Sequence, residues 1–258
     1  MPNPICNVLE KIRKFKKRQR RSRECCAITI HKSAAVPFVP DTFIECPLCQ
    51  VSEGAHFYED HRVYFRCPTC LLVYVPPQQF LSAQEEKAVY DQHQNSPHDS
   101  GYRRFLGRLF EPMSQRLPLN SRGLDFGSGP GPTLSVMFEE AGHTMEIYDP
   151  FYSPDIIPLQ QQYDFITATE VLEHLHHPRR EMDRLWSCLK LNGSLGIMTK
   201  RVLDREAFSS WHYKNDPTHV CFYSIETFQW LANDWCATLT VLGNDVVVFT
   251  KDQISDDR

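Results

Sequence analysis

The sequence predicts an α/β protein in which a doubly wound, mostly parallel sheet is preceded by a small metal-binding domain. Three observations lead to this prediction. Short apolar strands alternate with amphipathic helices beyond Asn120, three glycines follow the first of these strands, and four cysteines nearer the N-terminus form two Cys-x-x-Cys pairs. Alternation of strands and helices is typical of a mostly parallel sheet covered by helices on both faces.

The first strand and helix of the alternating region show the pattern. Residues 123–126 predict a short strand, and Pro132 suits the first position of the next helix, where no amide hydrogen is needed. Apolar residues then recur every three or four positions until Gly142 ends the helix. By the same reasoning we expect strands at 144–148, 165–168 and 195–198, a helix carrying Met182, Leu185, Trp186 and Leu189 that stops at Gly193, a helix capped by Ser224, and a hairpin of 238–242 and 246–249.

Charge is distributed unevenly along the 258 residues, whose net charge is −4. Residues 1–40 hold ten basic and two acidic side chains, so the remainder carries a net charge of −12. Blocks of like charge usually stay solvated, so we expect 1–40 to be a basic, disordered extension, with a nucleic-acid tail or a membrane-surface segment as alternatives. An acidic body disfavours nucleic acid as a partner.

Neither a membrane span nor a secretory signal is apparent in the sequence. No apolar run approaches the ~20 residues of a membrane helix, and no apolar segment follows the basic N-terminus. We therefore expect a cytoplasmic protein without membrane association. The sequence contains no indication of the oligomeric state.

Four cysteines predict a metal site. Seventeen residues separate the second cysteine from the third, and apolar segments at 63–66 and 71–75 predict strands that bring the two pairs together. Four thiolates at this spacing are typical of a tetrahedral zinc ribbon, and a segment below ~40 residues needs such a metal to fold. Iron in the same cage stays open, whereas disulfides are disfavoured in a reducing compartment. All four ligands are protein atoms, so the site is structural; they are Cys46, Cys49, Cys67 and Cys70, in a domain at 41–78.

The three glycines predict a nucleoside site. Gly127, Gly129 and Gly131 follow a strand and precede a helix, so that backbone amides can approach a ligand closely. Eighteen residues after Gly131, Asp149 ends the second strand, where a carboxylate can accept the hydroxyls of a ribose. A nicotinamide dinucleotide fingerprint fails, because Pro132 occupies its last glycine position.

The segment 124–131, Leu-Asp-Phe-Gly-Ser-Gly-Pro-Gly, resembles the first motif of class I S-adenosylmethionine-dependent methyltransferases. The resemblance continues through Asp149, the fourth-strand segment 163–174 and the turn 189–195 before strand five, and covers about residues 85–258. It implies a class I methyltransferase domain at 119–258 that binds S-adenosylmethionine. Thirteen residues between Asp149 and Tyr163 are too few for that family's usual third helix and strand, and Asp155 is the one acid among them.

The resemblance also implies roles for other residues. A helical linker at 79–118 contains the segment 90–104, which such enzymes fold over the donor as a lid; an exposed loop before a helix is the alternative. The aromatic segment 211–224 follows strand five and suits a pocket wall or a cover for the sheet edge. The donor-site candidates are Asp125, Gly127, Gly129, Gly131, Asp149, Glu170, His174, Tyr102 and Arg103, and the candidate bases are His212 and His219, since imidazole takes up a proton near pH 7.

These expectations combine into one functional hypothesis. We expect an S-adenosylmethionine-dependent methyltransferase that holds a structural zinc ion and acts on a small-molecule acceptor. An RNA methyltransferase, with the cysteine-rich head and the basic segment gripping phosphate, is one alternative. A non-catalytic protein that binds S-adenosylmethionine or a nucleotide is the other.

Overall fold

The computed structural model describes residues 44–51, 53–92 and 95–252, which all belong to one compact unit, Phe43–Arg258. The basic segment 1–40 lies outside the described residues, so the expectation of a disordered extension stays a prediction.

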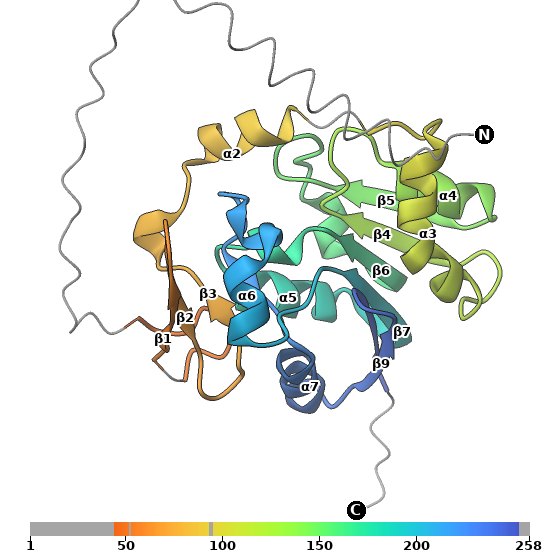
Figure 1. The fold of residues 1–258 in the computed structure, drawn as a ribbon. Coiled ribbons are helices and arrows are strands. Elements are labelled where there is room, and N and C mark those ends of the chain that lie inside the picture. Colours follow the sequence, from red (N-terminus) through yellow and green to blue (C-terminus); the bar gives the residue numbers. More distant parts are fainter. Residues whose placement is uncertain (1–43, 52, 93–94, 253–258) are drawn as a thin grey trace, which may run out of the picture. The chain divides into compact units, whose positions relative to one another are not determined.

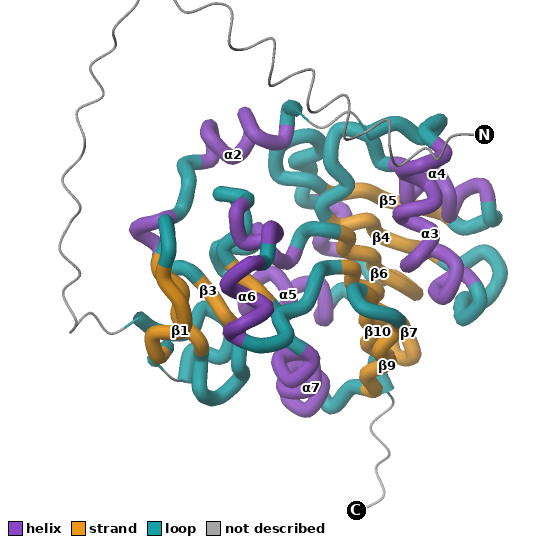
Figure 2. Tube along the Cα trace, viewed as in Figure 1, coloured by secondary structure: helices purple, strands orange, loops and turns teal. Residues whose placement is uncertain are grey.

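A six-stranded sheet forms the centre of this unit, in the order β5-β4-β6-β7-β10-β9 (Figures 1 and 2). The first four strands run parallel, and β10 is antiparallel to both β7 and β9. This confirms the doubly wound, mostly parallel sheet with a terminal hairpin. The strands are β4 (Arg122–Phe126), β5 (Thr144–Tyr148), β6 (Tyr163–Thr169), β7 (Leu189–Met198), β9 (Thr238–Leu242) and β10 (Val246–Thr250).

Helices cover both faces of the sheet, because alternate residues of each strand point to opposite faces. In β10, Val246 and Val248 join the apolar cluster of α3 (Ser100–Ser114) and α4 (Thr133–Glu140). Val247 and Phe249 join the cluster on the other face, to which α5 (Pro178–Ser187) and α7 (Ile225–Asp234) contribute. Figure 1 shows α3 and α4 together beside β4 and β5, away from α5 and α7. The remaining helices are α2 (Ala83–Tyr90), α6 (Arg205–Ser210) and the 3-10 helices η1 (Pro77–Gln79), η2 (Ile157–Gln160), η3 (Leu172–His174) and η4 (His212–Asn215).

The cysteine-rich head contains the two predicted strands, β2 (Val63–Arg66) and β3 (Val73–Tyr74), and two that the sequence did not indicate, β1 (Ala55–Glu59) and β8 (Cys221–Phe222). Strands β1, β2 and β3 form an antiparallel sheet. Its fourth strand, β8, comes from the chain after β7 and pairs with β3. The head also shares one buried apolar cluster with the main sheet. The head is therefore built into the same compact unit as the six-stranded sheet.

Two further sequence expectations meet different outcomes. Between Asp149 and Tyr163 there is only η2, so β5 lies at the sheet edge and the expected lack of a third strand is confirmed. The helix expected to include Leu189 ends at Ser187, and this expectation was wrong. Leu189 is the first residue of β7, pairs with Tyr163 and is buried. A buried apolar residue at this position fits the helical spacing, although it belongs to a strand.

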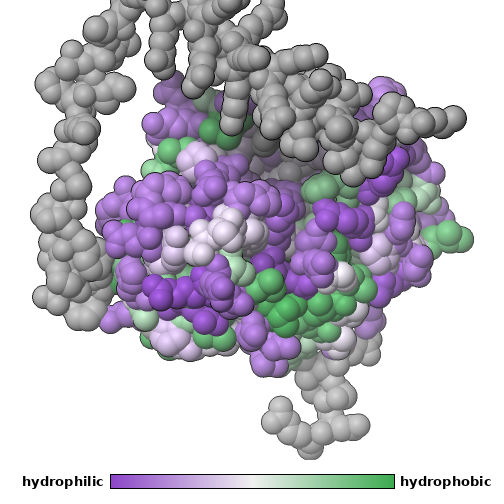
Figure 3. Space-filling view, viewed as in Figure 1, coloured by the Kyte–Doolittle hydropathy of each residue, from purple (hydrophilic) through white to green (hydrophobic). Residues whose placement is uncertain are grey.

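Burial of apolar side chains in the two clusters leaves mainly polar side chains at the surface of the described residues. Hydrophilic side chains occupy most of the face seen in Figure 3, with a smaller hydrophobic area among them. None of the helices in the described part of the chain combines the length and the apolar character that crossing a membrane requires.

Candidate active site

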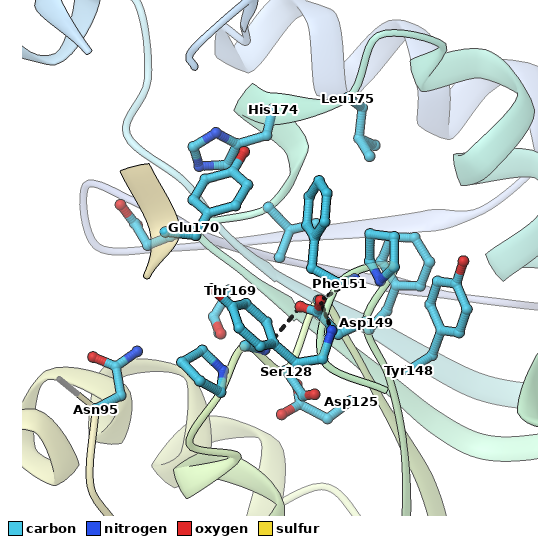
Figure 4. A pocket seen from close by; sticks show the side chains of 18 of the residues that line it. Asn95, Asp125, Ser128, Tyr148, Asp149, Phe151, Thr169, Glu170, His174 and Leu175 are labelled. Carbon is cyan, nitrogen blue, oxygen red and sulfur yellow. Dashed lines mark hydrogen bonds between the residues drawn. The ribbon is translucent and has the colours of Figure 1, made fainter. Parts of the chain in front are cut away.

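A cavity of about 690 Å³ opens beyond the carboxyl ends of β4, β5 and β6, where ligands of doubly wound sheets bind (Figure 4). Its wall combines the glycine bend after β4, the loop after β5, the segment after β6 and the chain between α2 and α3. Eight of the predicted site residues lie in this wall: Tyr102, Asp125, Gly127, Gly129, Asp149, Glu170, His174 and His219.

Asp149 joins the glycine bend to the end of β5. Its Oδ2 accepts a hydrogen bond from the Gly129 amide at 2.9 Å. Its Oδ1 accepts from the amides of Phe151 and Tyr152 at 2.8 and 3.0 Å (Figure 4). A carboxylate has about four lone-pair positions, so one remains for a hydroxyl donor such as a ribose. The side chain thus holds the bend in place and faces the cavity.

Two of the three glycines serve different purposes. A methyl group added at Gly129, where φ is +64°, would meet no atom within 4 Å, so the bend presents bare backbone to the cavity. At Gly131 the same methyl group would lie 2.3 Å from the Asn95 carbonyl oxygen. Gly131 was expected to contact the donor, but the structure leaves it out of the cavity wall. Its lack of a side chain lets the segment before α3 pack on the bend.

Asp125 lies at the bottom of the site and is fully buried. Its carboxylate accepts hydrogen bonds from Thr167 Oγ1 at 2.8 Å and Ser135 Oγ at 3.2 Å. Burial raises the pKa of Asp125 to about 6, against the opposing effect of these two hydroxyl donors. The side chain therefore changes charge near neutral pH.

The predicted lid segment is split between two roles. Tyr102 lines the cavity, and its hydroxyl accepts a hydrogen bond from Asn95 Nδ2 at 3.2 Å. Arg103 was expected to reach the methionine carboxylate, but it lies outside the cavity wall. Its guanidinium forms an ion pair with Glu140 of α4 and donates to the Pro97 carbonyl at 3.3 Å. One step along helix α3 turns the side chain about 100°, which carries Arg103 toward α4.

Glu170 directly follows β6 in a strained conformation with φ +52°, which is uncommon outside glycine and is typical of functional sites. Burial, and to a smaller extent the nearby Glu173 carboxylate, raises the pKa of Glu170 to about 8. Its Oε2 accepts a 3.4 Å hydrogen bond from the Tyr213 hydroxyl. The carboxyl group therefore holds its proton at neutral pH.

The two candidate bases are in different environments. His219 is 7 % exposed and lines the cavity, with Nδ1 2.7 Å from the Tyr213 carbonyl oxygen. Burial and the neighbouring His174 lower the pKa of His219 to about 4, so the ring is neutral at pH 7. His212 is exposed and outside the cavity wall, with Nε2 3.1 Å from Lys200 Nζ. The structure separates His212 from the site because η4 turns its side chain toward Lys200.

Sequence reasoning missed Arg62, which connects the head to the site. Arg62 lies in the turn between β1 and β2, is buried, and donates a hydrogen bond from its guanidinium to Tyr64 Oη at 3.2 Å. It donates to four carbonyl oxygens of the loop that carries His219, those of Lys214, Asp216, Pro217 and His219. No local pattern could reveal a contact across 150 residues or more. Reasoning also passed over Glu173, although the spacing Glu170-x-x-Glu173-His174 was a usable signal.

The four cysteines meet as the spacing predicted. None of the four forms a disulfide, all four are buried, and their sulfur atoms lie within 4.8 Å of one another. The two halves are built alike, since the amides of Gln50 and Leu71 each donate at 3.1 Å to the first cysteine carbonyl of their pair. Both residues have positive φ, +57° and +61°. Sulfur separations of 3.5 Å (Cys46–Cys70) and 3.4 Å (Cys49–Cys67) are close to the ~3.8 Å of a zinc-centred tetrahedron, so the residues fit the metal.

Comparison with known proteins identifies a family. Residues 98–235 match a family described as a methyltransferase domain. No curated protein matches the chain. Among solved structures, 1,6-didemethyltoxoflavin-N1-methyltransferase of Burkholderia thailandensis is 15 % identical over 77 % of this chain and 99 % of that one, with a TM-score of 0.42. An O-methyltransferase family protein of the same organism is 11 % identical over 66 % and 64 %, with a TM-score of 0.43. The plantazolicin methyltransferase BpumL is 12 % identical over 66 % and 90 %, also with a TM-score of 0.43.

Proposed function

Because the chain belongs to the methyltransferase-domain family matched over residues 98–235, it is an S-adenosylmethionine-dependent methyltransferase, and we propose that its acceptor is a small molecule. Membership in a family of enzymes argues against a non-catalytic binder.

The acidic wall of the cavity carries this proposal. A volume of about 690 Å³ is within the range of small-molecule sites. Among the described residues that line it there are six carboxyl groups, one arginine and no lysine. A nucleic-acid strand needs cations to neutralise its phosphates, so this wall favours a neutral or cationic small molecule over RNA. The six are Glu86, Asp125, Asp149, Glu170, Glu181 and Asp216, of which Glu170 holds its proton at neutral pH and adds no charge.

The residues in the wall bind and orient the reactants. When bound, S-adenosylmethionine supplies an electrophilic methyl group on a positively charged sulfur. Asp149 accepts a hydrogen bond from a ribose hydroxyl, and the open backbone at Gly129 lets the donor approach the bend. Orientation in line for displacement can contribute ~7–11 kcal/mol to such a reaction. Burial keeps the His219 ring neutral at pH 7, but a pKa of about 4 makes it a weak proton acceptor, so its free lone pair suits a ligand better than a general base.

We also propose that Cys46, Cys49, Cys67 and Cys70 hold a structural zinc ion. The matching turns and the sulfur separations support it, and four protein ligands leave no position for substrate. A thiolate site of this kind suits the reducing cytoplasm, where we propose that the protein works.

The acceptor proposal is tested with methyl-labelled S-adenosylmethionine. The full chain is incubated with the donor and a cell extract, which is then separated into metabolites, RNA and protein. We expect label in the metabolite fraction. Label confined to RNA or to protein would overturn the proposal.

Two variants link that label to the site. Asp149→Asn removes the carboxylate at the donor, so we expect at least tenfold weaker binding of S-adenosylhomocysteine by calorimetry and loss of labelling. Asp155→Asn is the matched control, because Asp155 is exposed in the same loop and accepts only from the Ile157 amide among the described contacts. Equal binding by the two variants would contradict the assignment of Asp149.

A further inference from the structure

Three potential metal ligands meet in the wall of the cavity, apart from the four cysteines. Glu173, His174 and His219 each offer one ligand atom within 4.8 Å of the others. Glu173 and His174 belong to η3, shortly after β6, and His219 comes from the loop after η4. His174 and His219 line the cavity, and Figure 4 shows His174 beyond Glu170 there. A bound ion at this point would therefore face the substrates.

Backbone carbonyls orient both imidazole rings. His219 Nδ1 lies 2.7 Å from the Tyr213 carbonyl oxygen, and His174 Nδ1 lies 3.3 Å from that of Thr218. A carbonyl oxygen only accepts, so these contacts place the proton on Nδ1 and a lone pair on Nε2 of each ring. Metal-bound histidines characteristically donate their second ring N–H to such a carbonyl or to a carboxylate.

The buried environment of the Glu173 carboxylate favours a bound cation. Its side chain is fully buried and accepts hydrogen bonds from two neutral hydroxyls, those of Tyr213 and Thr199, the latter at 2.9 Å. Among the ion pairs of the described residues, none joins Glu173 to lysine or arginine, and His174 Nε2 is 3.9 Å from Oε1. An ionised carboxylate that is buried without a cation is costly, so the group must either keep a proton or take up a cation. A divalent ion between Glu173 and the two rings removes that cost.

We propose that Glu173, His174 and His219 bind a divalent transition-metal cation. Two imidazole nitrogens with one carboxylate suit ions from Mn²⁺ to Zn²⁺, and three protein ligands leave coordination positions open toward the cavity. Those positions take a hydroxyl oxygen of the methyl acceptor and fix it near the donor. This role of the ion rests on the proposed function, whereas binding of the ion does not.

Mn²⁺ is the probe that separates this site from the cysteines, because thiolates select softer ions. The full chain is titrated with MnCl₂ alone, and free Mn²⁺ is followed by electron paramagnetic resonance. We expect one Mn²⁺ per chain at the cluster. His174→Gln and Glu173→Gln each lower the affinity at least tenfold.

His56→Gln is the matched control. His56 lies 3.6 Å from the Glu59 carboxylate, but both side chains are exposed, so this pair should leave Mn²⁺ affinity unchanged. S-adenosylhomocysteine binding and the melting temperature report whether each variant is folded, and His174→Gln is the milder change because its side chain is 19 % exposed. No Mn²⁺ binding by the wild type, or equal binding by folded His174→Gln, overturns the proposal. Label transferred to RNA instead of metabolites would refute the acceptor class and leave this result standing.

Discussion

The open space at Gly129 makes a prediction that separates backbone strain from obstruction of the donor. Gly129 and Gly243 have nearly equal positive φ angles, +64° and +58°, and a methyl group added at either would meet no atom within 4 Å. Gly129 lines the cavity, whereas Gly243 lies in the turn between β9 and β10. Replacing each with alanine therefore imposes the same strain at two places, only one of which faces the donor.

The expected magnitudes follow from these two environments. An alanine forced into the left-handed region costs ~1–2 kcal/mol, and the lower entropy of the unfolded chain offsets part of it, so both variants should lose ~1 kcal/mol. In a unit of this size that loss lowers the melting temperature by ~2–4 °C. At Gly129 alone, the methyl group also occupies space meant for ligand, where overpacking costs ~1–3 kcal/mol.

Thermal unfolding and calorimetry with S-adenosylhomocysteine test both statements. We expect similar melting temperatures for Gly129→Ala and Gly243→Ala. Gly129→Ala should bind the ligand at least tenfold more weakly, whereas Gly243→Ala should match the wild type. If both variants bind with wild-type affinity, the glycine bend is not at the donor and the reasoning about the site is wrong.

Three further predictions concern other parts of the molecule. The folded pKa of Asp125, about 6, lies above its ordinary value of 3.8, so the stability of the wild type falls as pH rises between these values. In urea unfolding, the stability of Asp125→Asn relative to wild type should therefore rise by up to ~3 kcal/mol from about pH 4 to pH 7. A difference that does not depend on pH would contradict this. Cys46→Ser should lose one equivalent of zinc by elemental analysis, whereas the exposed Cys236→Ser should keep it, and equal zinc in both would count against the site. Arg62→Met leaves several buried carbonyl oxygens without donors, so urea unfolding should show a loss of ~3 kcal/mol in the free energy of unfolding. The matched variant Arg66→Met, at a partly exposed arginine, should lose less than ~1 kcal/mol. Equal losses would contradict a special role for Arg62.

Local patterns in the sequence were sufficient for the order of elements in the main sheet. Strand, glycine bend, helix and strand from 123 to 148 were predicted from apolar spacing, Pro132 and Gly142, and the structure has β4, α4 and β5 there. The short interval after Asp149 correctly predicted the missing third strand. Such features depend on residues within one or two turns of each other, which is the range that spacing describes.

Long-range contacts account for what was missed at the site. Arg103 lies next to Tyr102 in sequence, but its partner Glu140 on α4 takes it out of the cavity wall. His212 and His219 share one aromatic segment, and only His219 lines the cavity. Residue types indicated which side chains could do chemistry there, but their direction depended on neighbours from other elements.

The cysteine-rich head illustrates both sides of this division. Its four-sulfur site follows from two short turns of equal geometry, whose spacing is written in the sequence. Its attachment to the catalytic body through β8 and Arg62 joins residues 150 positions apart or nearly so, and depends on how the two sheets pack. The amino-acid sequence thus determined the strands of the main sheet, the glycine bend and the ligand types of this methyltransferase by local stereochemistry. The tertiary structure alone decided which carboxylates and imidazoles share one cavity, because burial and hydrogen bonding between distant segments exist only after the chain has packed.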